Sequence, residues 1–180
     1  MKMPLIILDR DGVINHDSDA YIKAPDEWEL IEGSGEAIAR LYESGYRIAV
    51  ATNQSGLGRG LFDLQTLERI HAKMRHAIGL DGGVLDVITF CPHTPDDNCG
   101  CRKPRTGLLQ AINQEITINP DTDWMVGDTD KDLLAAQRMG IRAALVETGK
   151  GSRVLRDGVV SRETTPVFKN LQAFATWLLD

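Results

Sequence analysis

The sequence predicts a doubly wound α/β fold, in which a parallel sheet is covered by helices on both faces. Short apolar runs alternate with helix-period segments along the 180 residues, and this alternation is typical of βα units. The first run, Leu5–Leu8, is apolar at every position, as expected of a parallel strand that is buried on both faces. The length fits a single domain over residues 1–180, because domains commonly hold roughly 100–200 residues.

Turn residues and helix caps predict the elements that follow the first strand. Residues 12–33 are polar with no clear period, so we expect a long loop or flap, which in a compact domain is usually functional. Ser34 should cap the next helix and Gly45 should end it, before a second strand at residues 47–52. One face of this helix is apolar and carries Ala37, Ile38, Leu41 and Tyr42.

The middle of the chain continues the alternation. Asp63 should cap a helix with an apolar stripe, which we assign to core packing. Residues 85–90 form the third expected strand, and residues 106–116 form the helix after it. The apolar stripe consists of Leu64, Leu67, Ile70, Met74 and Ile78.

The last third adds two strands and two helices. A fourth strand is expected at residues 123–126, a helix at about 129–139 with Gly140 behind it, and a fifth strand at Arg142–Val146. Residues 149–158 are expected to form a loop. Residues 171–179 should form a closing helix.

Polar side chains follow several of the predicted strands. Ligands of a parallel sheet bind at the carboxyl ends of its strands. Asp9, Asp11, Asp128 and Lys103 are expected at that edge. Asp9 and Asp11 are two residues apart, so in an extended chain they project to the same side and repel unless a cation or a shared proton intervenes. With Asp128 as a third hard oxygen donor, the set suits Mg²⁺.

The segment TNQSGLGRG after the second strand has the chemistry of an anion-binding loop. Gly56 and Gly58 would make backbone N–H groups approachable, and Thr52 supplies a hydroxyl, so that phosphate oxygens could be held there. Lys103 would add a positive charge that neutralises both a phosphoryl oxygen and the carboxylates.

A compact group of metal-ligand residues follows the third strand. Cys91, His93, Cys99 and Cys101 offer three sulfurs and one nitrogen, which is a complete tetrahedral set for a structural Zn²⁺. Three cysteines in a reducing compartment fit thiolate ligands better than disulfides. A closed site leaves no position for a catalytic water. A DNA-binding finger would need a longer span between ligand pairs and a basic recognition helix.

Taken in order, four segments resemble the motifs of the haloacid dehalogenase superfamily of phosphatases: DRDG at 9–12, ATN at 51–53, Lys103, and GDTDKD at 127–132. The resemblance implies that Asp9 attacks phosphorus and forms an aspartyl phosphate. It implies that Asp11 protonates the leaving oxygen and later activates the hydrolytic water.

The same resemblance implies the residues that hold the metal and the transferring group. Mg²⁺ would be held by the side chains of Asp9 and Asp128 and by the backbone carbonyl of Asp11, with Asp132 behind them orienting water or the lysine. Thr52 or Asn53, together with Lys103, would stabilise the transferring phosphoryl group.

The motifs DRDGVIN, NQSGLGRG and CPH…CxCRKP in one chain are similar to those of the bacterial D-glycero-D-manno-heptose 1,7-bisphosphate 7-phosphatases. This zinc-bearing subgroup, which has no large cap domain, is shared with the histidinol-phosphate phosphatases. The resemblance implies a phosphoric monoester hydrolase that removes the 7-phosphate in ADP-heptose and lipopolysaccharide biosynthesis. The residues that would contact substrate are Asp17, Ser18, Asp19, Tyr21, Asn53, Gln54, Ser55, Arg102 and Thr129.

Arg102 and Thr129 bear on which member of this subgroup the chain resembles. Arg102 would read the second phosphate or the sugar, and together with the flap it favours the heptose enzyme. Thr129 stands where some relatives carry lysine, so one expected phosphate contact differs. Histidinol-phosphate phosphatase stays open as an alternative, as does a catalytically silent, zinc-stabilised module that binds phosphosugars.

Composition and hydropathy limit the partners. The chain has 26 acidic and 20 basic residues and a net charge of −6, which disfavours nucleic acid, anionic membranes and therefore a DNA 3′-phosphatase. The apolar run near the N-terminus is too short for a signal peptide or a spanning helix. We therefore predict a cytoplasmic protein, which acts on a small phosphosugar and, given its small open site, is a monomer.

Overall fold

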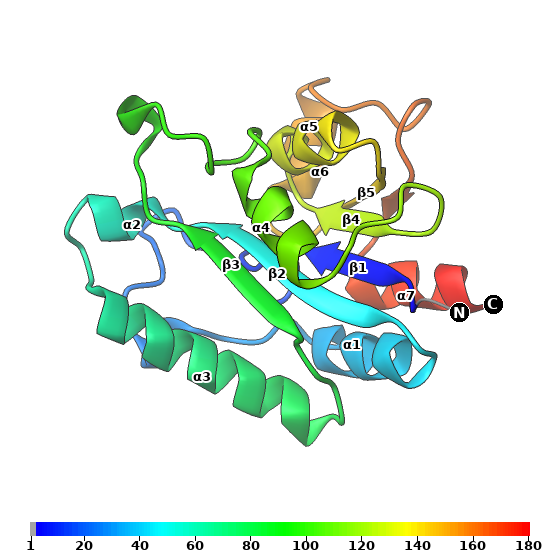
Figure 1. Ribbon diagram of the computed structural model, residues 1–180, viewed down its shortest axis with the longest axis horizontal. Coiled ribbons are helices and arrows are strands. Elements are labelled where there is room, and N and C mark those ends of the chain that lie inside the picture. Colours follow the sequence, from blue (N-terminus) through cyan, green and yellow to red (C-terminus); the bar gives the residue numbers. More distant parts are fainter. Residues whose placement is uncertain (1–2) are drawn as a thin grey trace.

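The computed structural model describes residues 3–180, and these form a six-stranded parallel sheet between helices (Figure 1). The strand order is β3-β2-β1-β4-β5-β6, so the chain moves outward first on one side of β1 and then on the other. The predicted doubly wound fold is confirmed. The strands are β1 Leu5–Leu8, β2 Arg47–Asn53, β3 Val87–Cys91, β4 Trp124–Gly127, β5 Arg142–Val146 and β6 Val167–Phe168.

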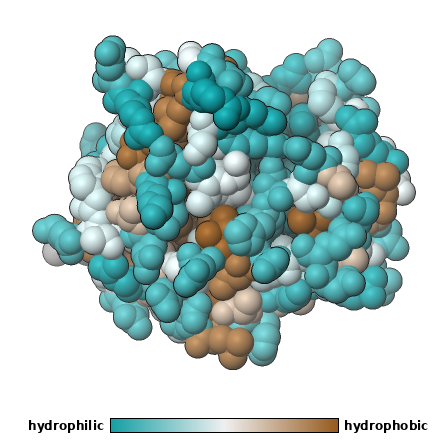
Figure 2. Space-filling view, turned by 180° about the vertical axis from the view of Figure 1, so that it is seen from behind, coloured by the Kyte–Doolittle hydropathy of each residue, from teal (hydrophilic) through white to brown (hydrophobic). Residues whose placement is uncertain are grey.

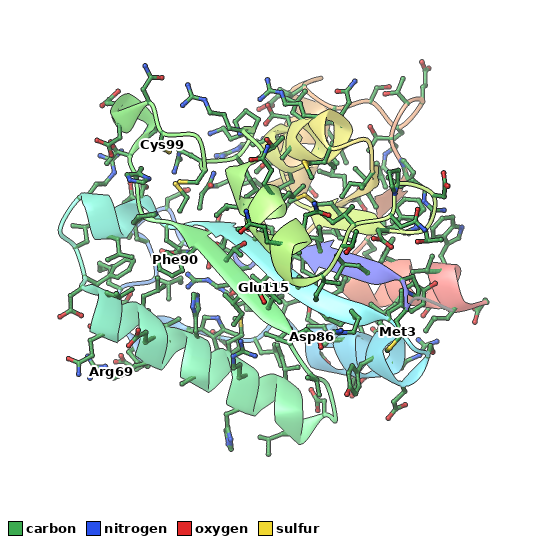
Figure 3. All side chains as sticks on the ribbon, in the orientation of Figure 1. Met3, Arg69, Asp86, Phe90, Cys99 and Glu115 are labelled. Atoms are coloured by element: carbon green, nitrogen blue, oxygen red, sulfur yellow. The ribbon has the colours of Figure 1, made fainter. Side chains whose placement is uncertain are left out.

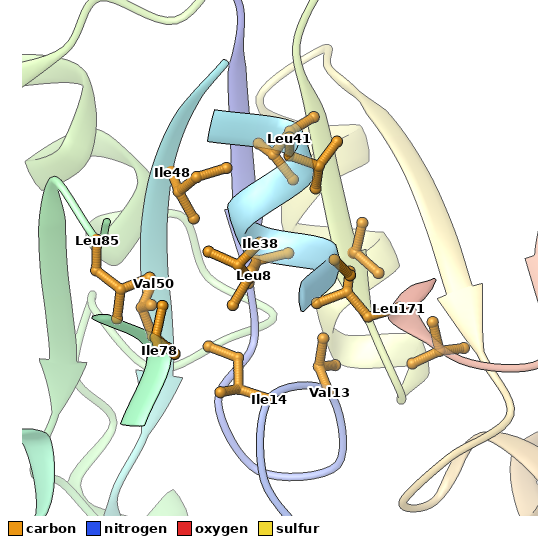
Figure 4. Packing of buried hydrophobic residues seen from close by; sticks show 14 of the residues in the cluster. Leu8, Val13, Ile14, Ile38, Leu41, Ile48, Val50, Ile78, Leu85 and Leu171 are labelled. Carbon is orange, nitrogen blue, oxygen red and sulfur yellow. The ribbon is translucent and has the colours of Figure 1, made fainter. Parts of the chain in front are cut away.

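Alternate residues of each buried strand enter two separate cores, because successive side chains of a strand point to opposite faces. Ile6 and Leu8 pack on one face, beneath α1, α3 and α7, as Figure 4 shows for Leu8 with Ile38 and Leu171. Leu5 and Ile7 pack on the other face, beneath α4 and α5. The helices are α1 Ser34–Glu43, α2 Ser55–Gly58, α3 Leu64–Leu80, α4 Gly107–Glu115, α5 Asp130–Arg138, α6 Gly151–Arg156 and α7 Leu171–Leu179.

Three predictions about individual side chains are wrong. Ser34 does not cap α1: it is the first helical residue, and its Oγ donates to the carbonyl of Val13 at 2.9 Å. That bond ties the helix to the flap. Tyr42 is 36% exposed and Leu64 is 49% exposed, so both lie at the margin of the apolar faces to which they were assigned. Asp63 caps α3 as predicted, because its Oδ1 accepts from the backbone N–H of Thr66 at 2.8 Å.

Short elements account for the remaining differences. The predicted loop at 149–158 contains α6, and α2, β6 and two 3-10 turns, Pro25–Glu27 and Pro95–Asp97, were not expected. None of these segments spans two helical turns or more than two strand residues, so none carries a readable hydrophobic period. The third strand begins at Val87 and ends at Cys91, which places the first cysteine on the strand itself.

The surface seen in Figure 2 is predominantly polar, with separate small apolar patches. Within residues 3–180, no helix has the length and apolar character that crossing a membrane requires. The prediction about the N-terminal run falls partly on residues 1–2, which lie outside the described part of the chain.

Candidate active site

A cavity of about 270 Å³ opens at the carboxyl ends of the strands, where the strand order reverses between β1 and β4. Crevices at such switch points are the usual ligand sites of doubly wound sheets. Most of the residues predicted from the sequence line this cavity. They are Asp9, Asp11, Asp17, Ser18, Asp19, Tyr21, Asn53, Gln54, Ser55, Arg102, Lys103, Asp128, Thr129 and Asp132.

Three carboxylates and one ammonium group form the floor of the cavity. Carboxylate oxygens of Asp9, Asp128 and Asp132 all lie within 4.8 Å of one another. Lys103 Nζ lies 3.0 Å from Asp9 Oδ1 and 2.7 Å from Asp132 Oδ1, and it also donates to the carbonyl of Ala51. Lys103 therefore joins the end of β2 to the acidic cluster.

Crowding of negative charge perturbs the pKa values of this acidic cluster. Burial, and then the Asp132 charge, raise the pKa of Asp9 to about 7. Burial, and then the Asp9 and Asp132 charges, raise the pKa of Asp128 to about 9. Burial by itself would lower the pKa of Lys103, but the Asp132 and Asp9 carboxylates hold it above its ordinary value. One lysine does not balance three carboxylates.

The acidic cluster fits a divalent cation. Its donors are hard carboxylate oxygens with no sulfur or nitrogen among them, which is the set that Mg²⁺ prefers. Asp9 and Asp128 would hold the ion, with Asp132 bonded to Lys103 beside them. A bound Mg²⁺ would supply positive charge that offsets the crowded carboxylates.

The Asp11 carboxylate lines the same cavity as Asp9 but is not one of the three carboxylates that lie within 4.8 Å of one another. The strand ends at Leu8, so residues 9–11 do not follow strand alternation. Arg10, Asn15 and Gln54 all donate to the Asp11 carboxylate. Burial by itself would raise the pKa of Asp11, but the Arg10 charge and these donors hold it below its ordinary value.

The glycines of the predicted anion loop have a packing role. The N–H of Gly58 donates to the carbonyl of Pro92 at 2.9 Å, so it is not free for a phosphate. A Cβ at Gly58 would lie 2.6 Å from that oxygen, and one at Gly56 would lie 2.4 Å from the ring of Phe62. Glycine at position 58 therefore lets the backbone approach the metal-ligand loop, and glycine at position 56 leaves room for the ring of Phe62.

Thr52 and Asn53, which precede these glycines, differ from each other in their access to the cavity. Thr52 is fully buried, its Oγ1 accepts from Gln54 Nε2 at 2.9 Å, and it is not among the residues that line the cavity. Asn53 lines the cavity and also pairs with the backbone of Lys103, donating to its carbonyl at 3.1 Å and accepting from its N–H at 3.0 Å. Asn53 thus fixes the lysine from the neighbouring strand.

The four predicted zinc ligands converge as expected. Cys91 Sγ lies 3.6 Å from both Cys99 Sγ and His93 Nδ1, and Cys101 Sγ lies 3.6 Å from Cys99 Sγ. Ligand atoms around a tetrahedral Zn²⁺ lie roughly 3.5–3.8 Å apart, so these three distances fit. Cys101 Sγ lies closer to Cys91 Sγ, at 3.0 Å, and to His93 Nδ1, at 3.2 Å, so these two pairs would have to move apart around the ion. In Figure 3, Cys99 is labelled on the loop beyond Phe90 and the end of β3. Arg102, whose N–H points at Cys99 Sγ, and Lys103 follow this cluster directly.

The flap carries a second set of contacts. Asp17 Oδ2 lies 3.3 Å from Nζ of Lys150. The backbone N–H of Lys150 donates to Asp128 Oδ2 at 2.8 Å. The guanidinium of Arg59 lies 6.0 Å from the centre of the Tyr21 ring. Tyr21 has a φ of 66°, an uncommon conformation for a bulky residue. The flap is therefore tied to both rims of the cavity.

Sequence reasoning missed three cations that line the cavity: Arg59, Lys131 and Lys150. Arg59 and Lys131 lie inside the quoted motifs NQSGLGRG and GDTDKD, so their position beside the functional residues was the available signal. Lys150 follows β5 in a segment taken for a loop. Only the reversal of strand order brings that segment beside the flap.

The fold and the site together define a hydrolase of the haloacid dehalogenase (HAD) class, with an acidic cluster and a buried lysine at the switch point of a doubly wound sheet. Residues 100–174, which include Lys103, Asp128 and Asp132, match the family model HAD-hyrolase-like. The insert between β1 and α1 is a short flap, as predicted.

Comparison with known proteins narrows this class. The chain is 51% identical to a D-glycero-beta-D-manno-heptose-1,7-bisphosphate 7-phosphatase of Pseudomonas putida, over 98% of this chain and 100% of that protein. The solved D,D-heptose 1.7-bisphosphate phosphatase from B. bronchiseptica, complexed with magnesium and phosphate, has a TM-score of 0.93 and 48% identity over 98% of each chain. The corresponding Burkholderia thailandensis structure has a TM-score of 0.77 and 42% identity, over 98% of this chain and 99% of that one. The chain belongs to the family of the heptose 1,7-bisphosphate 7-phosphatases.

The raised pKa values of the crowded carboxylates predict how the stability of the metal-free protein depends on pH. The pKa values of Asp9 and Asp128, about 7 and about 9, lie above the ordinary 3.8. As pH rises from about 4 to about 9, the unfolded state releases protons that the folded state keeps, so stability falls. Between about pH 5 and pH 8, the thermal midpoint of the metal-free protein should fall further than that of Asp128→Asn.

The control for this prediction is magnesium itself. Added Mg²⁺ should raise the midpoint of the wild type more at about pH 8 than at about pH 5, because the ion binds the ionised carboxylates. If the midpoints of wild type and Asp128→Asn change equally with pH, the three carboxylates do not share one unbalanced site.

Proposed function

We propose that the protein is a Mg²⁺-dependent phosphatase that removes the 7-phosphate of D-glycero-D-manno-heptose 1,7-bisphosphate, on the route to the nucleotide-activated heptose of lipopolysaccharide. The observation that carries the reaction type is the position of Asp9. Its side chain is 14% exposed and opens into the cavity, whereas that of Asp132, on the same lysine, is 1% exposed. The curated relatives carry the substrate assignment.

Asp9 would act as the nucleophile. An oxygen of its carboxylate forms a bond to phosphorus while the bond from phosphorus to the sugar oxygen breaks, which leaves an aspartyl phosphate. Lys103, 3.0 Å from Asp9, holds that carboxylate in place and balances negative charge on the phosphoryl oxygens. Asp132 fixes the lysine from the opposite side at 2.7 Å.

Asp11 would move the protons. In its protonated form it gives a proton to the departing sugar oxygen. As a carboxylate it then takes a proton from the water that attacks phosphorus, while the bond from phosphorus to Asp9 breaks and frees the Asp9 carboxylate and inorganic phosphate. Asp11 is not one of the three clustered carboxylates, and its donors favour the carboxylate form that takes the proton from the water. Thr52 would act through Gln54, because its hydroxyl accepts from that side chain behind the cavity wall.

The rim of the cavity would recognise the rest of a bisphosphate. Arg102, Arg59, Lys131 and Lys150 line the cavity and supply positive charge in addition to Lys103. Asp17, Ser18, Asp19 and Tyr21 of the flap would face the sugar hydroxyls.

We further propose that residues 1–180 work as one domain, that the protein is cytoplasmic and that it is a monomer. Sedimentation at several concentrations tests the monomer.

A panel of phosphate esters tests the substrate. Phosphate release should be fastest, by kcat/KM, from heptose 1,7-bisphosphate, measured for both anomers alongside fructose 1,6-bisphosphate and histidinol phosphate. A clear preference for histidinol phosphate would replace the proposal with the alternative phosphatase. Binding of the bisphosphate without turnover of any ester would identify a catalytically silent module.

A further inference from the structure

Arg10 is a buried cation that the proposed reaction does not use. Its side chain is fully buried, is among the largest fully buried side chains of the described residues, and is not part of the cavity lining. Burying a guanidinium is costly unless its donors are satisfied. Its polar partners therefore show what it is held for.

One side of the Arg10 guanidinium grips the carboxylate of Asp11. Nε donates to Asp11 Oδ1 at 3.0 Å, and Nη2 lies 2.9 Å from Oδ1 and 3.1 Å from Oδ2. A planar fork of this kind fixes the plane of a carboxylate as well as its position. Asn15 Nδ2 and Gln54 Nε2 donate to the same carboxylate at 2.8 Å each, one to each oxygen.

The other side of the guanidinium meets His71 of α3. Arg10 Nη1 lies 3.3 Å from His71 Nε2. Arginine has only donors, so Nε2 must accept and the ring proton must sit on Nδ1. Burial, and then the Arg10 charge, lower the pKa of His71 to about 3, so the imidazole is neutral and keeps its acceptor. His71 thus fixes the far end of the guanidinium.

The contacts form a continuous line from a core helix to the cavity: His71 on α3, Arg10, and the Asp11 carboxyl group. α3 is a 17-residue helix whose buried residues Ile70 and Met74 flank His71 in the core, so the imidazole rests on a rigid element. Without His71 the buried Nη1 would lose its partner. The guanidinium could then turn away from Asp11.

We propose that Arg10 and His71 are positioning residues, which hold the Asp11 carboxyl group in the orientation that transfers a proton to the leaving oxygen. The inference rests on the proposed function, because it assigns a task to residues behind Asp11. A proton matters most for a sugar alkoxide, which is a poor leaving group. It matters little for p-nitrophenolate, which leaves without one.

The test compares the two kinds of leaving group. His71→Phe removes the acceptor. The new phenyl ring should be tolerated, because the His71 ring already lies 6.3 Å from the ring of Phe90. We expect kcat/KM for heptose 1,7-bisphosphate to fall about 10–100-fold, and kcat/KM for p-nitrophenyl phosphate to fall by less than about 3-fold. His71→Gln, which keeps an acceptor, should recover most of the loss. His76→Phe, at an exposed position of the same helix, is the matched control.

Arg10→Lys carries the comparison if His71→Phe does not fold, since lysine keeps the charge but cannot form the fork. Equal losses on both esters, or wild-type values in both variants, would overturn the inference. If the wild type hydrolyses an alkyl phosphate but not the heptose ester, the substrate assignment fails, and the alkyl and aryl esters still test the positioning. A wild type that hydrolyses neither ester overturns both proposals.

Discussion

Replacing Asp9 with asparagine is expected to reduce phosphate release by on the order of 10³-fold or more, because the amide cannot form the bond to phosphorus. Asn has nearly the same shape, and Lys103 keeps its 2.7 Å contact with Asp132. The fold should therefore survive. The measurement is single-turnover phosphate release from heptose 1,7-bisphosphate, together with the thermal unfolding midpoint.

Asp26→Asn is the matched control, because Asp26 is an exposed carboxylate in the 3-10 turn of the flap. It should leave both quantities unchanged. Phosphate release by Asp9→Asn within about 10-fold of the wild type would exclude covalent catalysis by Asp9 and would point to direct attack of water.

Replacing His93 with glutamine is expected to have the largest effect on stability. The change removes one of four converging ligands, so the chain should lose bound Zn²⁺ and on the order of 4 kcal/mol of unfolding free energy. Phosphate release should fall about 10-fold, because the Lys103 backbone is held between the metal-ligand loop and Asn53. Zinc content by mass spectrometry, urea unfolding and phosphate release measure the three effects.

His76→Gln makes the same substitution at an exposed position of α3 and should keep zinc, stability and activity. A His93→Gln variant that loses zinc but retains full activity would show that the metal stabilises its own loop and not the lysine. Stability unchanged on zinc loss would contradict a structural role for the four-residue cluster.

Local patterns were enough to predict most of the fold. Uniformly apolar Leu5–Leu8 and the run Arg142–Val146 were placed with the bounds that the structure gives, because a buried parallel strand needs no partner to be recognised. Asp63 was placed as a cap because its bond to the backbone of Thr66 is local. Ser34 was misplaced because its actual partner, the carbonyl of Val13, lies 21 residues away.

The sequence by itself determined which residues could carry the chemistry. Spacing placed four zinc ligands in one short segment, and the apolar runs placed Asp9, Asp128 and Lys103 at strand ends, where a parallel sheet gathers them. Ligand type and spacing are properties of the chain, so these groupings needed no knowledge of distant contacts.

Only the tertiary structure decided what each side chain faces. It placed the Asp11 carboxylate against Arg10, and it placed Arg10 against His71, which lies 61 residues further along the chain. It paired the N–H of Gly58 with the carbonyl of Pro92, and it brought Lys150 beside Asp17 of the flap. The physical reason is that a buried polar group must find a partner wherever the fold provides one, and that partner is set by the packing of α3, β5 and the flap, not by neighbours in sequence.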